Sequence, residues 1–181
     1  FGKGPLDIVV DSTGLSIHGE GKRRQEKHGN HRRRGRRKLH LAVDHEGLVL
    51  SSSITNEARK DASQAGRLLK AVPGRMRSFT ADGGYDERRA YAAVVAHSPK
   101  ASVIIPPRVN AQKSPAATTV LKQRNKHIKA IATFGVYRWR RESGYYRQSI
   151  VENTIYRYKK IIGTRLRARN ENSRKVEAVL G

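Results

Sequence analysis

Three carboxylates in this sequence stand where a folded sheet can bring them together. Asp11 directly follows the β-branched run 8–10, Asp82 follows the short run 78–81, and Glu152 lies in a segment whose apolar residues recur at helical spacing. Side chains at the carboxyl ends of neighbouring strands meet at one edge of an open sheet. Clustered carboxylates repel one another unless a cation neutralises them, and Mg²⁺ prefers such oxygen ligands. The three acids therefore predict a magnesium site.

The charge of the chain indicates what such a site would act on. Lys and Arg number 38 against 15 Asp and Glu, a formal net charge of +23. This excess destabilises a compact fold unless a polyanion lies nearby, and nucleic acid is the commonest one, with an anionic membrane surface as the weaker alternative. Two Mg²⁺ ions about 3.5–4 Å apart can activate an attacking oxygen and stabilise a leaving oxygen in a phosphodiester. Phosphoryl transfer on a nucleic-acid backbone fits both features.

Each acid also has a purely structural interpretation. Asp11 before Ser-Thr-Gly can form an Asx-turn at the end of a strand, and an Asp-Gly pair such as that at Asp82 is common in turns. Glu152 fits the N3 position of a capping box that begins at Ser149. Other acids stand at element ends as well, so spacing alone does not select the set; they are Asp61, Asp86 and Glu177.

The order of elements along the chain indicates a single α/β domain. We expect strands over 8–10, 39–43, 48–54, 78–81 and 102–105, and helices over 61–72 and 87–96. The segment 44–47 reads as the turn of a hairpin, and Asp61 reads as the cap of the first helix. Strands that alternate with helices after an antiparallel hairpin imply a layered fold with a mixed sheet.

The second half of the chain contains a basic segment and a long helix. Residues 106–144 read as an insertion, with a helix around 120–131 and a basic aromatic cluster at 137–141. The spacing predicts a helix over 149–162. Its apolar stripe is Val151, Ile155, Tyr158 and Ile162, and a separate stripe holds Glu152, Tyr156 and Lys159.

Composition excludes several classes of protein. The sequence has no cysteine, which rules out disulfides, thiolate zinc sites and cysteine nucleophiles. It has no long uncharged apolar run and no opening signal-peptide pattern, so we expect a soluble protein of the cytoplasm. Spacing gives no zinc site at His28, His31 or His40, which read as solvated or hydrogen-bonded histidines.

Basic and aromatic residues supply candidate DNA contacts. The segment 22–38 holds ten Lys and Arg residues and is expected to contact phosphates, with a solvated charged loop as the alternative. Trp139, among three arginines, can stack on an unpaired base or anchor the insertion in the core. Arg108 and Lys159 are placed to hold phosphate near the acids.

Five ordered motifs, spread from about Asp7 to about Val179, carry a resemblance to a known family. The sequence resembles the catalytic domain of DDE-type insertion-sequence transposases over the stretches 10–15, 38–44, 81–86, 105–108 and 149–152. The resemblance implies a ribonuclease-H-like fold with a mixed five-stranded sheet, a core over about 5–105 and 145–181, and a basic, mostly helical insertion over 106–144.

The resemblance also implies the activity and its cofactor. Asp11, Asp82 and Glu152 would be the catalytic, metal-binding triad, with two Mg²⁺ ions that Mn²⁺ can replace. The expected reaction is hydrolytic strand cleavage at the transposon ends, followed by joining of the freed 3′-hydroxyl to target DNA. The expected partner is double-stranded DNA, with no membrane, and the expected assembly is a homodimer on DNA associated with a prokaryotic nucleoid.

Family members carry a Tyr, Arg, Glu, Lys signature separated by two, three and six residues. Tyr145, Glu152 and Lys159 fit it, whereas Gln148 replaces the Arg and Arg147 stands beside it. A neutral amide still donates hydrogen bonds to phosphate but lacks the charged fork of Arg. The full set of expected DNA contacts is Arg33, Arg36, Lys38, Arg108, Trp139, Tyr145, Arg147, Gln148 and Lys159.

Two alternatives stay open at this point. One is a non-catalytic basic DNA-binding remnant of a transposase, which Gln148 favours, and the other is a standalone metal-dependent nuclease that cuts without joining. We also expect an N-terminal DNA-recognition region and a C-terminal continuation outside the sequence, because the family normally has both.

Overall fold

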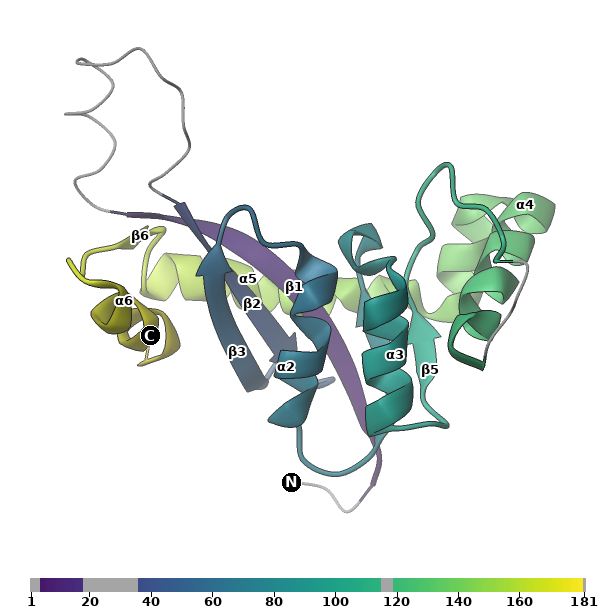
Figure 1. The fold of residues 1–181 in the computed structure, drawn as a ribbon, viewed down its shortest axis with the longest axis horizontal. Coiled ribbons are helices and arrows are strands. Elements are labelled where there is room, and N and C mark those ends of the chain that lie inside the picture. The colour runs from purple at the N-terminus through teal and green to yellow at the C-terminus, as the bar shows by residue number, and fades with distance from the viewer. Residues whose placement is uncertain (1–3, 18–35, 115–118, 181) are drawn as a thin grey trace, which may run out of the picture.

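The computed structural model describes residues 4–17, 36–114 and 119–180. It has three layers, with a mixed sheet between helices on its two faces (Figure 1). The sheet order is β3-β2-β1-β4-β5, and β6 pairs with the far end of β1. The strands are β1 (Leu6–Ile17), β2 (Arg36–Val43), β3 (Val49–Asn56), β4 (Met76–Ala81), β5 (Ser102–Ile104) and β6 (Arg165–Leu166). The expected mixed sheet of five strands is confirmed, with the two-residue β6 as an unpredicted addition.

The predicted hairpin is confirmed, but the prediction for the first strand was too short. β2 and β3 are antiparallel, and Asp44 Oδ1 accepts hydrogen bonds from two backbone amides of the turn between them. β1 does not end at Asp11. It continues through Ser12, Thr13 and Gly14, which pair with β2, so the expected turn there was wrong. The physical reason is that a partner strand supplies ladder hydrogen bonds to residues that would otherwise favour a turn.

One face of the sheet is covered by α2 (Ala65–Lys70) and α3 (Arg88–His97), which lie in front of it in Figure 1. Even-numbered residues of β1, Ile8 and Val10, pack into this core with Phe79 and Leu68. The helix predicted from Asp61 is divided into η1 (Asp61–Ser63) and α2. Asp61 does not cap a helix, because its side chain bonds instead to groups on the sheet.

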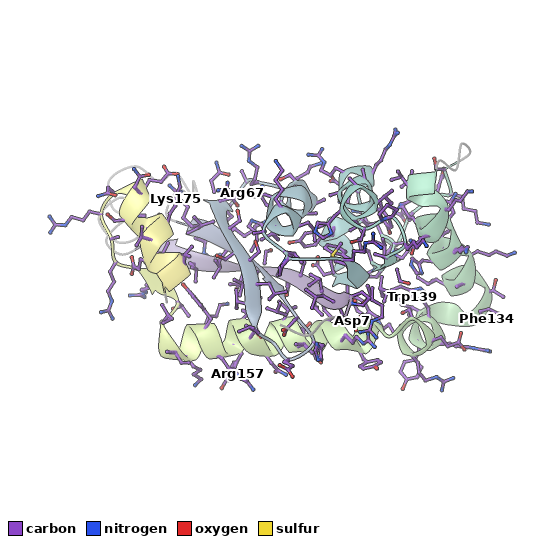
Figure 2. The ribbon with its side chains drawn as sticks, turned by 90° about the horizontal axis from the view of Figure 1, so that it is seen from below. Asp7, Arg67, Phe134, Trp139, Arg157 and Lys175 are labelled. Atoms are coloured by element: carbon purple, nitrogen blue, oxygen red, sulfur yellow. The ribbon has the colours of Figure 1, made fainter. Side chains whose placement is uncertain are left out.

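The other face is covered by α5 (Gln148–Ile161) and, at its far end, α6 (Glu171–Leu180). Odd-numbered residues of β1 such as Val9 pack against Val151 and Ile155, the predicted apolar stripe. In Figure 2, α5 runs along the opposite side of the sheet from α2 and α3. The capping-box alternative at Ser149 is contradicted, since its hydroxyl donates to the carbonyl of Tyr146.

The segment 106–144, which we expect to be an insertion, contains η3 (Thr119–Leu121) and α4 (Lys122–Ser143), and α4 is broken at Gly135 (φ 79°). Two of its side chains cover the free edge of β5. Gln123 accepts from the Val103 amide at 2.8 Å and donates to the Ala101 carbonyl, and His127 Nε2 lies 2.7 Å from the Val103 carbonyl. These contacts satisfy backbone groups that an edge strand leaves exposed.

A buried ion pair also fastens α4. Both carboxylate oxygens of Asp86 accept from Arg124, at 2.7 and 3.0 Å, and the Asp86 side chain has no exposed surface. Asp86, one of the acids that spacing could not exclude from the site, is therefore a structural residue. None of the helices in the described ranges is long and apolar enough to cross a membrane.

Candidate active site

Asp11 and Asp82 lie side by side because of the register between β1 and β4. These strands are parallel, and their last partners are Val10 and Ala81. The next residue of each chain is one of the two aspartates. Asp82 leaves β4 into η2 (Gly83–Tyr85), where its Oδ1 accepts from the Gly84 amide at 3.0 Å. Asp11 stays in β1, and its Oδ1 accepts from the Ser12 amide at 2.7 Å.

Glu152 approaches the same pair from α5. Asp11 is an odd-numbered residue of β1 and so points to the face that α5 covers. The pKa of Asp11 is raised to about 6, mainly by burial, with the negative charges of Asp82, Glu152 and Asp61 contributing to the rise. Burial and the charge of Asp61 also raise the pKa of Asp82. The fold therefore brings the three predicted acids within electrostatic reach of one another.

Asp61, predicted from the sequence to cap a helix, is a fourth acid near Asp11 and Asp82. It reaches the pair from η1, on the α2 side of the sheet. A sequence pattern in β2 could have indicated a polar partner here, because polar Lys38 and His40 alternate with Leu39 and Leu41. Such alternation marks a polar face that needs a polar partner. Lys38 Nζ lies 2.9 Å from Asp61 Oδ1, and His40 Nδ1 lies 3.7 Å from it.

The chemistry of these side chains fits a hard divalent cation. All four acids offer carboxylate oxygens, the donors that Mg²⁺ accepts. Within residues 4–17, 36–114 and 119–180, no three acidic or histidine side chains already form a group that could hold a metal ion. Glu152 is exposed and has to turn towards Asp11 to join such a group. Like charges repel, so carboxylates gather closely around a cation or when one of them takes up a proton.

Tyr145, the first residue of the signature motif, lies within electrostatic reach of Asp82, Glu152 and Asp11. Burial raises the pKa of its hydroxyl to about 12, and the charge of Asp82 contributes. Its ring centroid is 5.5 Å from that of Trp139, and the guanidinium of Arg140 lies 5.9 Å from its ring centroid. The tyrosine therefore links the acids to the insertion.

The basic residues predicted to contact DNA lie in different places. Lys38 is half-buried and paired with Asp61, whereas Arg36 is exposed and 3.7 Å from Glu57. Arg108 is exposed, 3.4 Å from Glu87. Lys159 is half-buried on α5. Arg33 and most of the basic segment 22–38 lie outside the described residues.

Gln148 is buried where a phosphate ligand was expected, whereas its neighbour Arg147 is half-buried. Gln148 is buried, and its Nε2 donates to the Val10 carbonyl at 3.2 Å, beside Asp11. Arg147 pairs with Asp7 near the start of β1, at 3.4 Å. The expectation that Gln148 contacts DNA is wrong, because its buried amide ties α5 to the strand that carries Asp11. The predicted DNA contact of Arg147 stays a prediction.

The expectation that Trp139 stacks on a base is also corrected. Only 3% of Trp139 is exposed, and its Nε1 donates to His127 Nδ1 at 2.9 Å. Because Nδ1 accepts, Nε2 of His127 carries the proton that it donates to the Val103 carbonyl. Trp139 is thus the core anchor of the insertion, the alternative from the sequence analysis. Figure 2 labels it at the α4 end of the molecule.

A solved structure gives a remote likeness. Residues of this chain superpose on a chain of the simian T-cell lymphotropic virus intasome bound to PP2A regulatory subunit B56 gamma, with a TM-score of 0.36 and 17% identity. The match covers 86% of this chain and 50% of that chain, so this chain spans about half the length of the viral one.

A family model gives a match over nearly the whole chain. The family described as "Transposase DDE domain" matches residues 2–181, and so includes Asp11, Asp82 and Glu152. The sheet order and the two covered faces agree with the ribonuclease-H-like fold that the resemblance implied. The chain belongs to the transposase DDE domain family.

Proposed function

We propose that this chain is the catalytic domain of an insertion-sequence transposase that cuts and joins DNA at Asp11, Asp82 and Glu152. One observation carries the proposal: the parallel register ends at Val10 and Ala81, so that two half-buried aspartates follow it on neighbouring strands. The pKa of Asp11, raised to about 6 by burial with Asp82 and Glu152 contributing, supports the same grouping. Family membership supports transposase chemistry.

In this proposal Asp11 and Asp82 hold two Mg²⁺ or Mn²⁺ ions, and Glu152 turns in from α5 to complete the set. The bound ions would supply activation of the attacking oxygen and stabilisation of the leaving oxygen. The Ser12 and Gly84 amides orient the two aspartates, at 2.7 and 3.0 Å. A proton on Asp11 competes with the cation, so cutting should weaken as the pH falls below about 6.

The remaining expectations form part of the same proposal. The substrate is double-stranded DNA, both transposon ends and target, which the net charge of +23 suits. Residues 106–144 are an insertion in a core over about 5–105 and 145–181. Two copies act together on paired ends in the cytoplasm, at the nucleoid of a prokaryote.

A plasmid-nicking assay tests the proposal. The 181-residue chain should nick supercoiled DNA with Mg²⁺ or Mn²⁺ and not with EDTA, and D82N should reduce nicking to background. E142Q is the matched control, because it removes the same charge from an exposed glutamate of α4 that pairs with Arg138. Equal nicking by D82N and E142Q contradicts the assigned acids.

A joining assay separates the transposase from the two alternatives. A labelled duplex with a free 3′-hydroxyl should become covalently joined to the plasmid in the presence of Mg²⁺. Nicking without joining indicates a standalone nuclease. Salt-sensitive DNA binding without nicking indicates a non-catalytic remnant.

A further inference from the structure

Asp61 connects three parts of the structure next to the proposed centre. It is the first residue of η1, and its side chain is 19% exposed. Its Oδ1 accepts hydrogen bonds from Ser12 Oγ of β1 at 3.1 Å and from Lys38 Nζ of β2 at 2.9 Å. Lys38 also donates to the carbonyl of Arg59 at 3.2 Å. One carboxylate oxygen therefore ties η1 to two adjoining strands of the sheet.

The contact with Ser12 reaches Asp11. The backbone amide of Ser12 donates to Asp11 Oδ1 at 2.7 Å, while the hydroxyl of the same residue donates to Asp61. Side chains alternate along a strand, so Asp11 points to the α5 face and Ser12 to the opposite face. Asp61 thus holds, from behind the strand, the residue whose amide orients the Asp11 carboxylate.

Asp61 also lies close to Asp82. A Cβ atom placed on Gly84 would stand 3.1 Å from Asp82 Oδ1 and 3.2 Å from Asp61 Oδ2, so both carboxylates border the same small space. Lys38, which Asp61 holds, lowers the pKa of Asp82 by its positive charge, opposing the larger effect of burial. Gly84 leaves room for the two acids to stand this near.

Two buried polar side chains lie near Asp61. Tyr85 and His40 have no exposed surface, and in the described part of the chain neither Tyr85 Oη nor His40 Nδ1 has a hydrogen-bond partner. His40 Nδ1 is 3.7 Å from Asp61 Oδ1. Burial raises the pKa of Tyr85 well above its ordinary value, with the charges of Asp61, Asp11 and Asp82 adding to the effect. The phenol therefore lies within electrostatic reach of the acids.

We propose that Asp61 is a positioning residue of the acidic centre, which fixes Ser12 and Lys38 so that Asp11 and Asp82 present their oxygens to a divalent cation. We assign Asp61 a positioning role and not that of a ligand, because its Oδ1 accepts from a hydroxyl and from an ammonium group whose charge repels a metal ion. This inference rests on the proposed metal site. Groups that orient metal ligands typically change metal affinity or activity by roughly 10–100-fold when removed.

Mn²⁺ binding to the 181-residue chain, followed by electron paramagnetic resonance, tests the inference without measuring activity. We expect D61N to weaken Mn²⁺ binding by roughly 10–100-fold. S12A changes no charge and removes only the hydroxyl donor, so we expect it to weaken binding towards the lower end of that range. The double variant should lose less than the product of the two effects, since both changes break one contact.

D7N is the matched control. Asp7 is a buried aspartate of β1, the strand that carries Asp11. It accepts from Ser78 Oγ at 2.6 Å and pairs with Arg77 and Arg147, so it resembles Asp61 in having a hydroxyl donor and cationic partners. It lies four residues from Asp11 towards the start of β1. D7N should lower the unfolding temperature and leave Mn²⁺ affinity within about twofold, a tolerance that corresponds to roughly 0.4 kcal/mol.

The outcomes separate this inference from the proposed function. If D82N weakens Mn²⁺ binding but D61N or S12A binds as the wild type does, the positioning role is wrong and the metal site stands. If D7N and D61N weaken binding equally, the effect of Asp61 is one of general stability and the inference fails. If D82N binds Mn²⁺ as tightly as the wild type does, the proposed metal site is wrong, and the inference fails with it.

Discussion

Replacing Asp11 by Asn should stabilise the fold at neutral pH. Burial, with three neighbouring carboxylates, raises the pKa of Asp11 from 3.8 to about 6. A raised pKa means that the folded state binds its proton more tightly than the unfolded state, so ionisation of Asp11 destabilises the fold. Each tenfold change in proton affinity corresponds to about 1.4 kcal/mol, which makes the cost about 3 kcal/mol once Asp11 is ionised in both states.

The pH dependence follows from the same values. The stability contributed by protonated Asp11 is present below pH 3.8, falls as the pH rises from 3.8 to about 6, and is absent above that. D11N should therefore gain up to about 3 kcal/mol at pH 8 and little at pH 4. For a domain of this length such a gain corresponds to a rise of roughly 6–12 °C in unfolding temperature. The asparagine Oδ1 can still accept from the Ser12 amide.

Urea unfolding of D11N and wild type at five pH values from 4 to 8 measures the difference. E142Q is the control, because it also raises the net charge by one but from an exposed site. More positive charge on a chain of +23 is destabilising in general, so a gain in D11N runs against that trend. A gain of equal size at pH 4 and pH 8, or a loss at pH 8, would refute the electrostatic account of the site.

Four further predictions concern side chains of α4 and the glycine beside the acids. W139F keeps an aromatic ring but removes the Nε1 donor to His127, so we expect urea unfolding to show a loss of about 1 kcal/mol or more; no change would contradict the hydrogen bond. Burial lowers the pKa of His127, so the stability that neutral His127 contributes is present above pH 6.5 and is lost as the pH falls below that value. In H127Q the free energy of unfolding should therefore change less with pH in this range. R124M leaves Asp86 buried without its cation and should cost about 3–5 kcal/mol in thermal or urea unfolding, with a smaller loss refuting the importance of this ion pair. G84A places a methyl group 3.1 Å from Asp82 Oδ1 and should weaken Mn²⁺ binding in the resonance assay; unchanged binding would show that the two acids do not need this space.

Most elements were predictable because their local patterns were strong. The hairpin around 44–47, the helix with Val151 and Ile155, and the strand before Asp82 all have the expected type, with ends shifted by a few residues. The pattern failed at Ser12, Thr13 and Gly14, which favour a turn locally but pair with β2. Long-range ladder hydrogen bonds outweighed the local preference there.

The outcome for side chains depended on neighbours that are distant along the chain. For Trp139 among three arginines, the sequence left open both stacking on an unpaired base and anchoring the predicted insertion. Its partner, His127, is twelve residues away, and His127 in turn bonds to β5. Gln148 looked like a phosphate ligand, yet it is buried against the carbonyl of Val10, which no local pattern reveals.

The amino-acid sequence alone indicated a basic protein that binds nucleic acid, an α/β domain of this family, and three acids in ordered motifs. Charge, periodicity and motif order are properties of the chain itself, so they can be read without a structure. Tertiary structure alone revealed that the register of β1 and β4 places Asp11 beside Asp82, and that Asp61 stands behind them with Lys38. Distances between residues far apart in the chain follow from strand pairing and packing. Strand pairing places Asp11 beside Asp82, and packing of η1 on the sheet places Asp61 near both.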